Sequence, residues 1–154
     1  LYSTRANLTE ELGTCDLLIG AVLRPGARSP QLISRADLAL MKPGAVIVDV
    51  AVDQGGCTET TRPTTHDQPI YVVDGIVHYC VSNMPGAVAL TSTLALTSQT
   101  LAYGLALADH GLAAMTNNTA LRHGLNLHRG QVTHQALAES LGLPYTDPLL
   151  AIAQ

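Results

Sequence analysis

The 154-residue sequence has no phenylalanine and no tryptophan, so any hydrophobic core must be built from Leu, Val, Ile and Ala. Apolar residues nevertheless make up 47% of the chain, which excludes a disordered or fibrous protein. Lys42 is the one lysine, and the formal net charge is −4. Because no basic run occurs, the composition gives no indication of a nucleic-acid partner.

The sequence also has little cysteine, and its three thiols, Cys15, Cys57 and Cys80, contain no CxxC pair. An odd number of isolated cysteines argues against a disulfide framework and predicts reduced thiols, as in the cytoplasm. Six histidines occur, but none has the HExxH spacing, so no metal site is expected. His78 lies in a strand-like run and is predicted to be a core or crevice histidine.

A long stretch lacks charge altogether, since residues 75–108 contain no Asp, Glu, Lys or Arg. The stretch is interrupted by SNMPG and then by seven Thr, Ser and Gln residues between 91 and 100. That content is too polar for a transmembrane helix, so no membrane partner is expected. We predict a helix over residues 88–109 that is buried between protein layers.

Short apolar runs predict the strands. Residues 16–23 and 45–50 have strand length, and the second run is apolar on both faces, which is typical of a parallel sheet covered by helices. The runs 70–73 and 76–81 are separated by Asp74-Gly75, a strong hairpin signal.

Helices are expected to alternate with these strands. One follows a cap at Thr4 or Asn7, another covers 35–41 after Ser34, and two short ones lie near 119–123 and 133–141. The tail after Gly142 is predicted to be irregular. This order indicates an α/β fold, the second half of a doubly wound (Rossmann-type) parallel sheet with a β-hairpin, followed by helices. The first half is expected before Leu1.

Three segments are expected at the carboxyl ends of these strands, where open α/β sheets bind ligands. They are Val22-Leu23, residues 50–53 and residues 81–84, and we expect them to line one crevice. Asp53 would lie at its mouth, beside a turn containing two glycines. From spacing alone, two interpretations stay open: an acid that contacts a ligand, or a cap of the turn.

Several catalytic and binding motifs are missing. The sequence has no GxSxG nucleophile elbow and no GxxxxGK[ST] phosphate loop. It also has no GxGxxG, which counts against a complete dinucleotide site within these residues.

Longer motifs carry a specific resemblance. The sequence resembles the C-terminal part of the bacterial alanine dehydrogenase family in MKPGAVIVDVAVDQGGC, RPTTHDQPIY, YCVSNMPGAVALTSTLALT and the earlier DLLIGAVLRPGARSPQLIS. The resemblance covers nearly everything up to His110. The NAD-binding domain of proton-translocating transhydrogenase is similar at the strand end but typically lacks the acid of DQGG. Asp53 therefore favours the dehydrogenase.

This resemblance implies NAD-dependent oxidative deamination of L-alanine to pyruvate and ammonia, and the reverse reaction. Asp53 matches the family's active-site aspartate, which would orient the ammonium or iminium centre or its attacking water. Residues 3, 22 and 23 would contact the adenosine side of NAD, and residues 50–53 the nicotinamide side. The implied cofactor-binding residues are Ser3, Val22, Leu23, Val50, Ala51, Val52, Asp53, Arg62, Val81, Ser82, Asn83 and Met84.

The resemblance also implies a domain organisation. Residues 1–87 would be the C-terminal half of an NAD-binding Rossmann domain, and residues 88–154 a long linking helix with the C-terminal helices of the substrate domain. The family's glycine-rich loop, substrate-binding Arg and Lys, and acid/base His fall before Leu1, so the chain is expected to be a fragment. The whole enzyme is expected to be a cytoplasmic homo-oligomer. The alternatives are a non-catalytic NAD-binding or oligomerisation fragment and a transhydrogenase domain.

Overall fold

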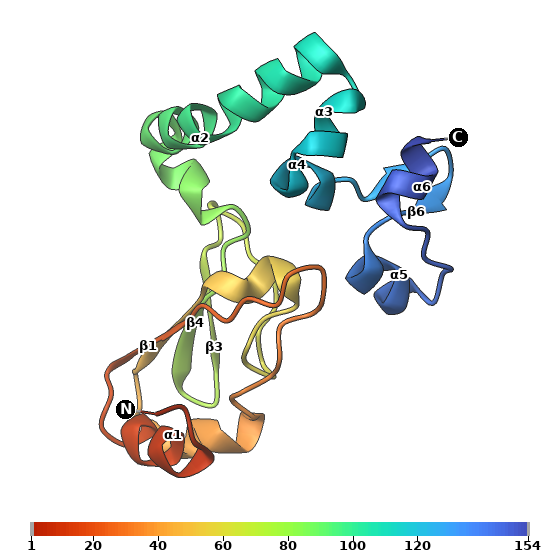
Figure 1. Ribbon diagram of the computed structural model, residues 1–154. Coiled ribbons are helices and arrows are strands. Elements are labelled where there is room, and N and C mark those ends of the chain that lie inside the picture. The colour runs from red at the N-terminus through yellow and green to blue at the C-terminus, as the bar shows by residue number, and fades with distance from the viewer. Residues whose placement is uncertain (1, 154) are drawn as a thin grey trace. The chain divides into compact units, whose positions relative to one another are not determined.

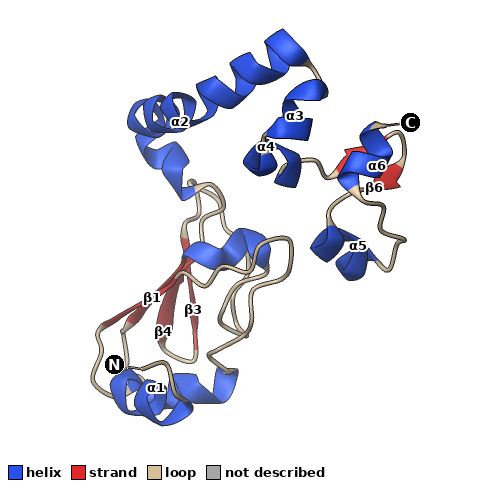
Figure 2. Ribbon diagram, in the orientation of Figure 1, coloured by secondary structure: helices blue, strands red, loops and turns tan. Residues whose placement is uncertain are grey.

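A four-stranded sheet forms the centre of the first part of the chain. In this computed structural model, which describes residues 2–153, the strands are β1 (Leu17–Gly20), β2 (Val46–Asp49), β3 (Ile70–Val73) and β4 (Ile76–Tyr79). Their order is β1-β2-β4-β3, with β1, β2 and β4 parallel and β3 antiparallel to β4 (Figures 1 and 2). The predicted α/β class, with parallel strands and a hairpin, is confirmed.

The turn residues fix the hairpin between β3 and β4. Asp74 and Gly75 both have positive φ, 49° and 83°, as a two-residue turn of this kind requires. The strand predicted over 16–23 is shorter than expected, because β1 ends at Gly20, opposite Asp49 of β2. The residues that follow are free to form a loop at the carboxyl edge of the sheet.

Two helices cover one face of the sheet. α1 (Arg5–Leu12) begins at Thr4, whose hydroxyl accepts the Asn7 N–H, as one of the two expected caps. η1 (Arg35–Leu40) is a 3₁₀-helix rather than an α-helix. The helix has six residues, between its cap at Ser34 and the Pro43-Gly44 turn. Few of the hydrogen bonds between residues four apart that define an α-helix can form over this length.

These helices and the sheet share one hydrophobic core. Its members come from α1, η1, β2, β4 and the loops beside them: Leu12, Ile33, Leu38, Met41, Ala45, Ile47 and Ile76. The other face of the sheet carries apolar side chains with no covering layer among the described residues. Leu17 and Ile19 of β1 and Ile70 and Val72 of β3 are more than half exposed. The core is therefore one-sided within this unit.

The chain divides into two compact units. The first runs to Ala87 apart from Pro25–Ala27, and the second contains that short segment and the residues from Val88 onward. η3 (Met84–Val88) ends at Val88, where the longer segment of the second unit begins. The second unit consists of α2 (Ala89–His110), α3 (Ala113–Asn117), α4 (Thr119–His123), β5 (Leu127–His128), β6 (Gln131–Val132), α5 (Gln135–Leu141) and α6 (Pro148–Ile152).

α2 matches the predicted helix in length. None of its 22 residues is buried, and Leu90, Leu94 and Leu101 are 75%, 62% and 62% exposed. Within residues 2–153 no layer covers the helix, so its burial between protein layers stays a prediction. No helix within residues 2–153 is both long and apolar enough to cross a membrane.

The predicted irregular tail is also partly wrong. α6 begins after Asp147, whose carboxylate accepts the N–H groups of Leu149 and Leu150, and Pro148 occupies the first helical position. An Asp cap followed by proline is a helix-start signal, which outweighs the helix-breaking tendency of proline elsewhere. The short hairpin of β5 and β6 was not predicted, because its strands have two residues each.

Candidate functional site

A hollow of about 310 Å³ lies at the carboxyl ends of β1 and β2. Two of the three expected segments meet there. The residues that line it are Ala21, Val22, Leu23, Val50, Ala51, Asp53 and Gln54. Its walls are mostly aliphatic, and its polar side chains come from the second segment alone. The hollow therefore combines a surface for a flat apolar group with one carboxylate and one amide.

The second segment reaches the hollow because β2 ends in a short 3₁₀-helix, η2 (Val50–Gln54). Gly55 ends this helix with φ of 95°, a left-handed conformation that favours glycine. Gly56, with φ of 76°, continues the turn, and a Cβ there would lie 2.9 Å from an Asp49 carboxylate oxygen. The glycine pair therefore allows the chain to reverse its direction immediately after η2.

Asp53 is exposed and lines the hollow from the first turn of η2. The carboxylate that the structure uses as a cap is that of Asp49, which accepts the Ala51 N–H at 3.0 Å. The interpretation of Asp53 as a cap of the turn therefore finds no support in these bonds. Next to it, the buried side-chain oxygen of Gln54 accepts no hydrogen bond from the described residues.

Asp49 was missed by sequence reasoning, which assigned it to the strand. It is fully buried, and its carboxylate accepts hydrogen bonds from both sides of the η2 turn. The Cys57 N–H donates at 2.9 Å and the Thr61 hydroxyl also donates to the same oxygen. An acid within an otherwise apolar run, VIVDV, is the sequence signal that could have identified it.

The third expected segment does not line this hollow. Val81 is fully buried and pairs with Thr64, and the Ser82 N–H donates to Thr64 O at 3.2 Å. Asn83 has φ of 59°, and its backbone oxygen accepts a hydrogen bond from His66 Nε2 at 3.1 Å. Met84, which begins η3, is half-buried.

Ser3 and Arg62, the two remaining predicted residues, also lie outside the hollow lining. Ser3 is exposed immediately before the cap of α1. The Arg62 N–H donates to the Tyr71 hydroxyl at 2.9 Å, and its guanidinium carbon lies 4.1 Å from the centre of the Tyr71 ring. Val52, which belongs to η2, is buried and contributes to packing.

His78 is a core histidine, one of the two expected alternatives. It is fully buried, its Nε2 lies 2.8 Å from the Thr60 hydroxyl, and its Nδ1 lies 3.0 Å from Ile76 O. Burial lowers the pKa of His78, so the neutral ring is favoured. Its ring stacks on Tyr71 with centroids 4.9 Å apart. Both residues are therefore structural supports of the β3–β4 hairpin.

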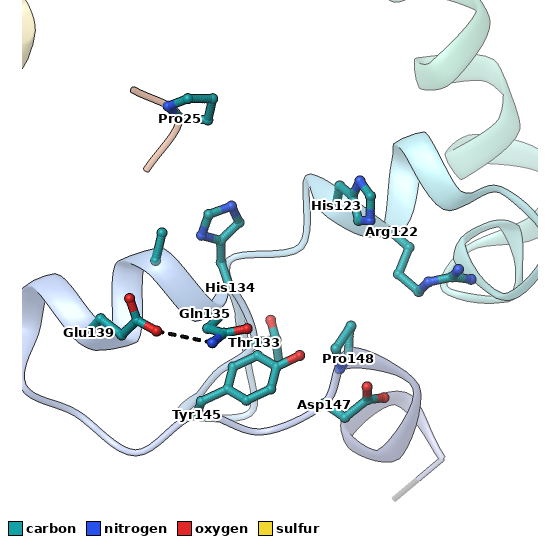
Figure 3. Close-up of a pocket in the computed structure, with 11 residues that line it drawn as sticks. Pro25, Arg122, His123, Thr133, His134, Gln135, Glu139, Tyr145, Asp147 and Pro148 are labelled. Atoms are coloured by element: carbon teal, nitrogen blue, oxygen red, sulfur yellow. Dashed lines mark hydrogen bonds between the residues drawn. The ribbon is translucent and has the colours of Figure 1, made fainter. Parts of the chain in front are cut away.

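A second, larger hollow lies in the second unit (Figure 3). Several of its polar residues make local bonds: His134 Nδ1 accepts the Leu137 N–H, and Gln135 donates to Glu139 at 3.0 Å. Asp147 caps α6 at its edge. These bonds stabilise α5 and the start of α6. Within residues 2–153, no group of three His, Cys, Asp or Glu side chains could hold a metal ion.

Comparison with known proteins shows that the chain is similar to alanine dehydrogenases. A family model described as alanine dehydrogenase/PNT, C-terminal domain, matches residues 1–135. The alanine dehydrogenase of Halomonas elongata is 56% identical over 148 residues, which are 96% of this chain and 40% of that protein. The alanine dehydrogenase of Mycobacterium tuberculosis is 50% identical over 153 residues, which are 99% of this chain and 41% of that protein.

Two solved structures are also similar to this chain. An L-alanine dehydrogenase superposes with a TM-score of 0.78 at 49% identity, over 92% of this chain and 39% of that one. A transhydrogenase from Sinorhizobium meliloti gives a TM-score of 0.53 at 32% identity, over 58% of this chain and 25% of that one. The chain spans about 40% of the length of the relatives it matches. By its sequence and its fold, this chain belongs to the family of the alanine dehydrogenase/PNT C-terminal domain.

Proposed function

We propose that this chain is the C-terminal, NAD-binding part of an alanine dehydrogenase. The reaction is L-alanine + NAD⁺ + water → pyruvate + ammonium + NADH + H⁺, and it is reversible. The observation that carries the proposal is the hollow at the ends of β1 and β2, where Asp53 lies beside aliphatic walls in a chain 56% identical to an alanine dehydrogenase. The Asp53 side chain is exposed there and available to a ligand.

The residues that line the hollow fit part of a bound dinucleotide. Val22, Leu23 and Val50 offer aliphatic contacts to a flat ring, and the volume of about 310 Å³ is at the lower end of small-molecule sites. The unpaired, buried oxygen of Gln54 has the chemistry to accept an N–H or O–H donor. NAD, when bound, supplies the hydride acceptor of the reaction.

Asp53 has an electrostatic role in this proposal. Its carboxylate would attract the ammonium group of alanine and stabilise the positive charge of the iminium that follows oxidation. The same carboxylate can accept a hydrogen bond from the water that attacks the iminium carbon. Because η2 is held at both ends, Asp53 has a defined position from which to orient the substrate carbon.

The proposed cofactor contacts include residues of the hollow and others outside it. Ser3 and Val22-Leu23 are assigned to the adenosine side, and residues 50–53 to the nicotinamide side. Arg62 and residues 81–84 are the other proposed contacts. The glycine-rich loop and the substrate-binding residues would come from an N-terminal part of the same protein. This agrees with the coverage of about 40% of the relatives.

The proposal extends to assembly and location. The exposed leucines of α2 are consistent with the expected homo-oligomer, because an uncovered apolar helix is typical of an interface. Three free thiols are consistent with the expected cytoplasmic location. The residues from 88 onward are assigned to the linking helix and the substrate domain.

The test is steady-state formation of NADH by the complete protein with L-alanine, together with the reverse reaction from pyruvate and ammonium. L-Alanine-dependent, saturable NADH formation is the expected result. Tight NAD binding without turnover would replace the proposal by a binding module. Hydride transfer to a second nucleotide, with none to pyruvate, would replace it by a transhydrogenase.

A further inference from the structure

The buried carboxylate of Asp49 connects two segments that surround Asp53. One of its oxygens accepts the Ala51 N–H at 3.0 Å. The other accepts the Cys57 N–H at 2.9 Å, the Thr58 N–H at 3.4 Å and the Thr61 hydroxyl. A single side chain therefore joins the start of η2 to the loop that returns beneath it.

Asp53 lies between these anchored ends. Ala51 precedes it by two residues and Cys57 follows it by four, with the left-handed Gly55 and Gly56 between. Because both ends bond to the same carboxylate, a shift of that carboxylate would move the whole η2 turn. The Asp53 side chain makes no hydrogen bond or ion pair with the described residues that could hold its carboxylate independently.

We propose that Asp49 is a positioning residue, which holds η2 so that Asp53 faces the substrate at the mouth of the hollow. This rests on the proposed function, because it assigns Asp49 to the reaction through Asp53. Asp49 contacts neither the hollow nor solvent, so its effect on turnover is indirect.

The geometry requires a carboxylate at residue 49. All its hydrogen-bond partners are N–H, O–H or S–H donors, and they approach both oxygens. An amide of the same shape has one acceptor oxygen and one NH₂ donor. Asp49→Asn would therefore place a donor against either the Ala51 N–H or the Cys57 and Thr61 donors, and one end of the turn would be released.

Turnover by the complete protein provides the first test. Asp53→Asn is expected to lower kcat by about 100-fold, as for loss of one preorganised electrostatic group. Asp49→Asn should lower kcat by about tenfold or more, in line with loss of a hydrogen bond to a charged group. If Asp49 acts through Asp53, adding Asp49→Asn to Asp53→Asn should lower kcat by less than about twofold. An undiminished tenfold loss in the double variant would overturn the proposal.

Thr61 gives a matched pair that keeps the test decisive if Asp49→Asn does not fold. Thr61→Val preserves shape but removes the hydroxyl that donates to Asp49, whereas Thr61→Ser keeps that hydroxyl. Thr61→Val should lower kcat by about fivefold and Thr61→Ser by less than twofold. Equal kcat values for the two variants would contradict a role of the Asp49 network in positioning.

Hydrogen exchange separates this proposal from the proposed function. The amides of Ala51 and Cys57 should exchange faster in Thr61→Val than in Thr61→Ser, because their shared acceptor is less well fixed. If wild type does not oxidise L-alanine, the proposed function fails, and the exchange rates still show whether Asp49 orders η2. Equal exchange rates in an active enzyme would overturn the positioning role alone.

Discussion

A methyl group added at Gly20 is expected to disrupt the junction between β1 and β2. A Cβ at this position would lie 2.1 Å from the Sγ of Cys57, a distance at which atoms overlap. It would also lie 3.5 Å from Asp49 Oδ1, which is ordinary contact. Cys57 is buried, and its thiol donates to Asp49 at 3.5 Å, so it has little freedom to move aside.

The size of the effect follows from these distances. Overpacking of a buried site costs about 1–3 kcal/mol of unfolding free energy, so Gly20→Ala should lie in this range. Cys57→Ala, which removes a buried sulfur, should cost about 1–2 kcal/mol. In the double variant the clash disappears and the new methyl fills part of the space left by sulfur. The unfolding free energy lost in the double variant should therefore be about 1–2 kcal/mol smaller than the sum of the losses in the two single variants.

Urea unfolding of the four proteins measures this coupling directly. Gly104→Ala is a suitable control, because Gly104 lies in α2 with open space around its Cβ position, and should stabilise by about 0.5–1 kcal/mol. Additive losses from Gly20→Ala and Cys57→Ala would refute the reasoning. So would a Gly20→Ala protein as stable as wild type.

Two further predictions concern stability. The Arg5 guanidinium lowers the pKa of Asp37 to about 2. The ionised Asp37 carboxylate therefore stabilises the folded protein fully above the ordinary Asp pKa of about 4, and this stabilisation is lost as pH falls through about 2. Unfolding free energy should therefore depend less on pH between 4 and 2 in Asp37→Asn, and an unchanged acid dependence would contradict this. Tyr71→Phe removes a hydroxyl that accepts the Arg62 N–H and donates to Thr60 O, both at 2.9 Å. Thermal unfolding should show a loss of about 1–2 kcal/mol, and no loss would contradict these bonds.

Much of the fold could be predicted because its signals are local. β2 is a β-branched run, the hairpin has Asp74-Gly75 at its turn, and α2 is a long segment with few breaks and one carboxylate, Asp109, near its end. Each of these features is specified by neighbouring residues. The 3₁₀ form of η1 and the helix α6 depend on short-range competition between caps and prolines, which sequence patterns resolve poorly. β5 and β6 have two residues each, too few to show an alternating pattern.

The candidate site could be predicted only in part. Strand ends placed Val22, Leu23, Val50 and Asp53 at one edge of the sheet, and the structure brings them together in one hollow. Asp49 was not identified, because its partners are donors between two and twelve residues away along a loop with no regular pattern. The sequence shows an acid within an apolar strand, but it does not show which donors the folded loop brings to that acid.

The most direct test of this account is the turnover of Asp53→Asn in the complete protein, measured as NADH formation from L-alanine. The substitution keeps the shape of an exposed side chain beside the hollow and removes its charge. The account predicts that NAD binding is retained while kcat falls by about 100-fold. A variant that binds NAD and turns over L-alanine like wild type would contradict the assignment of Asp53 and, with it, the proposed active site.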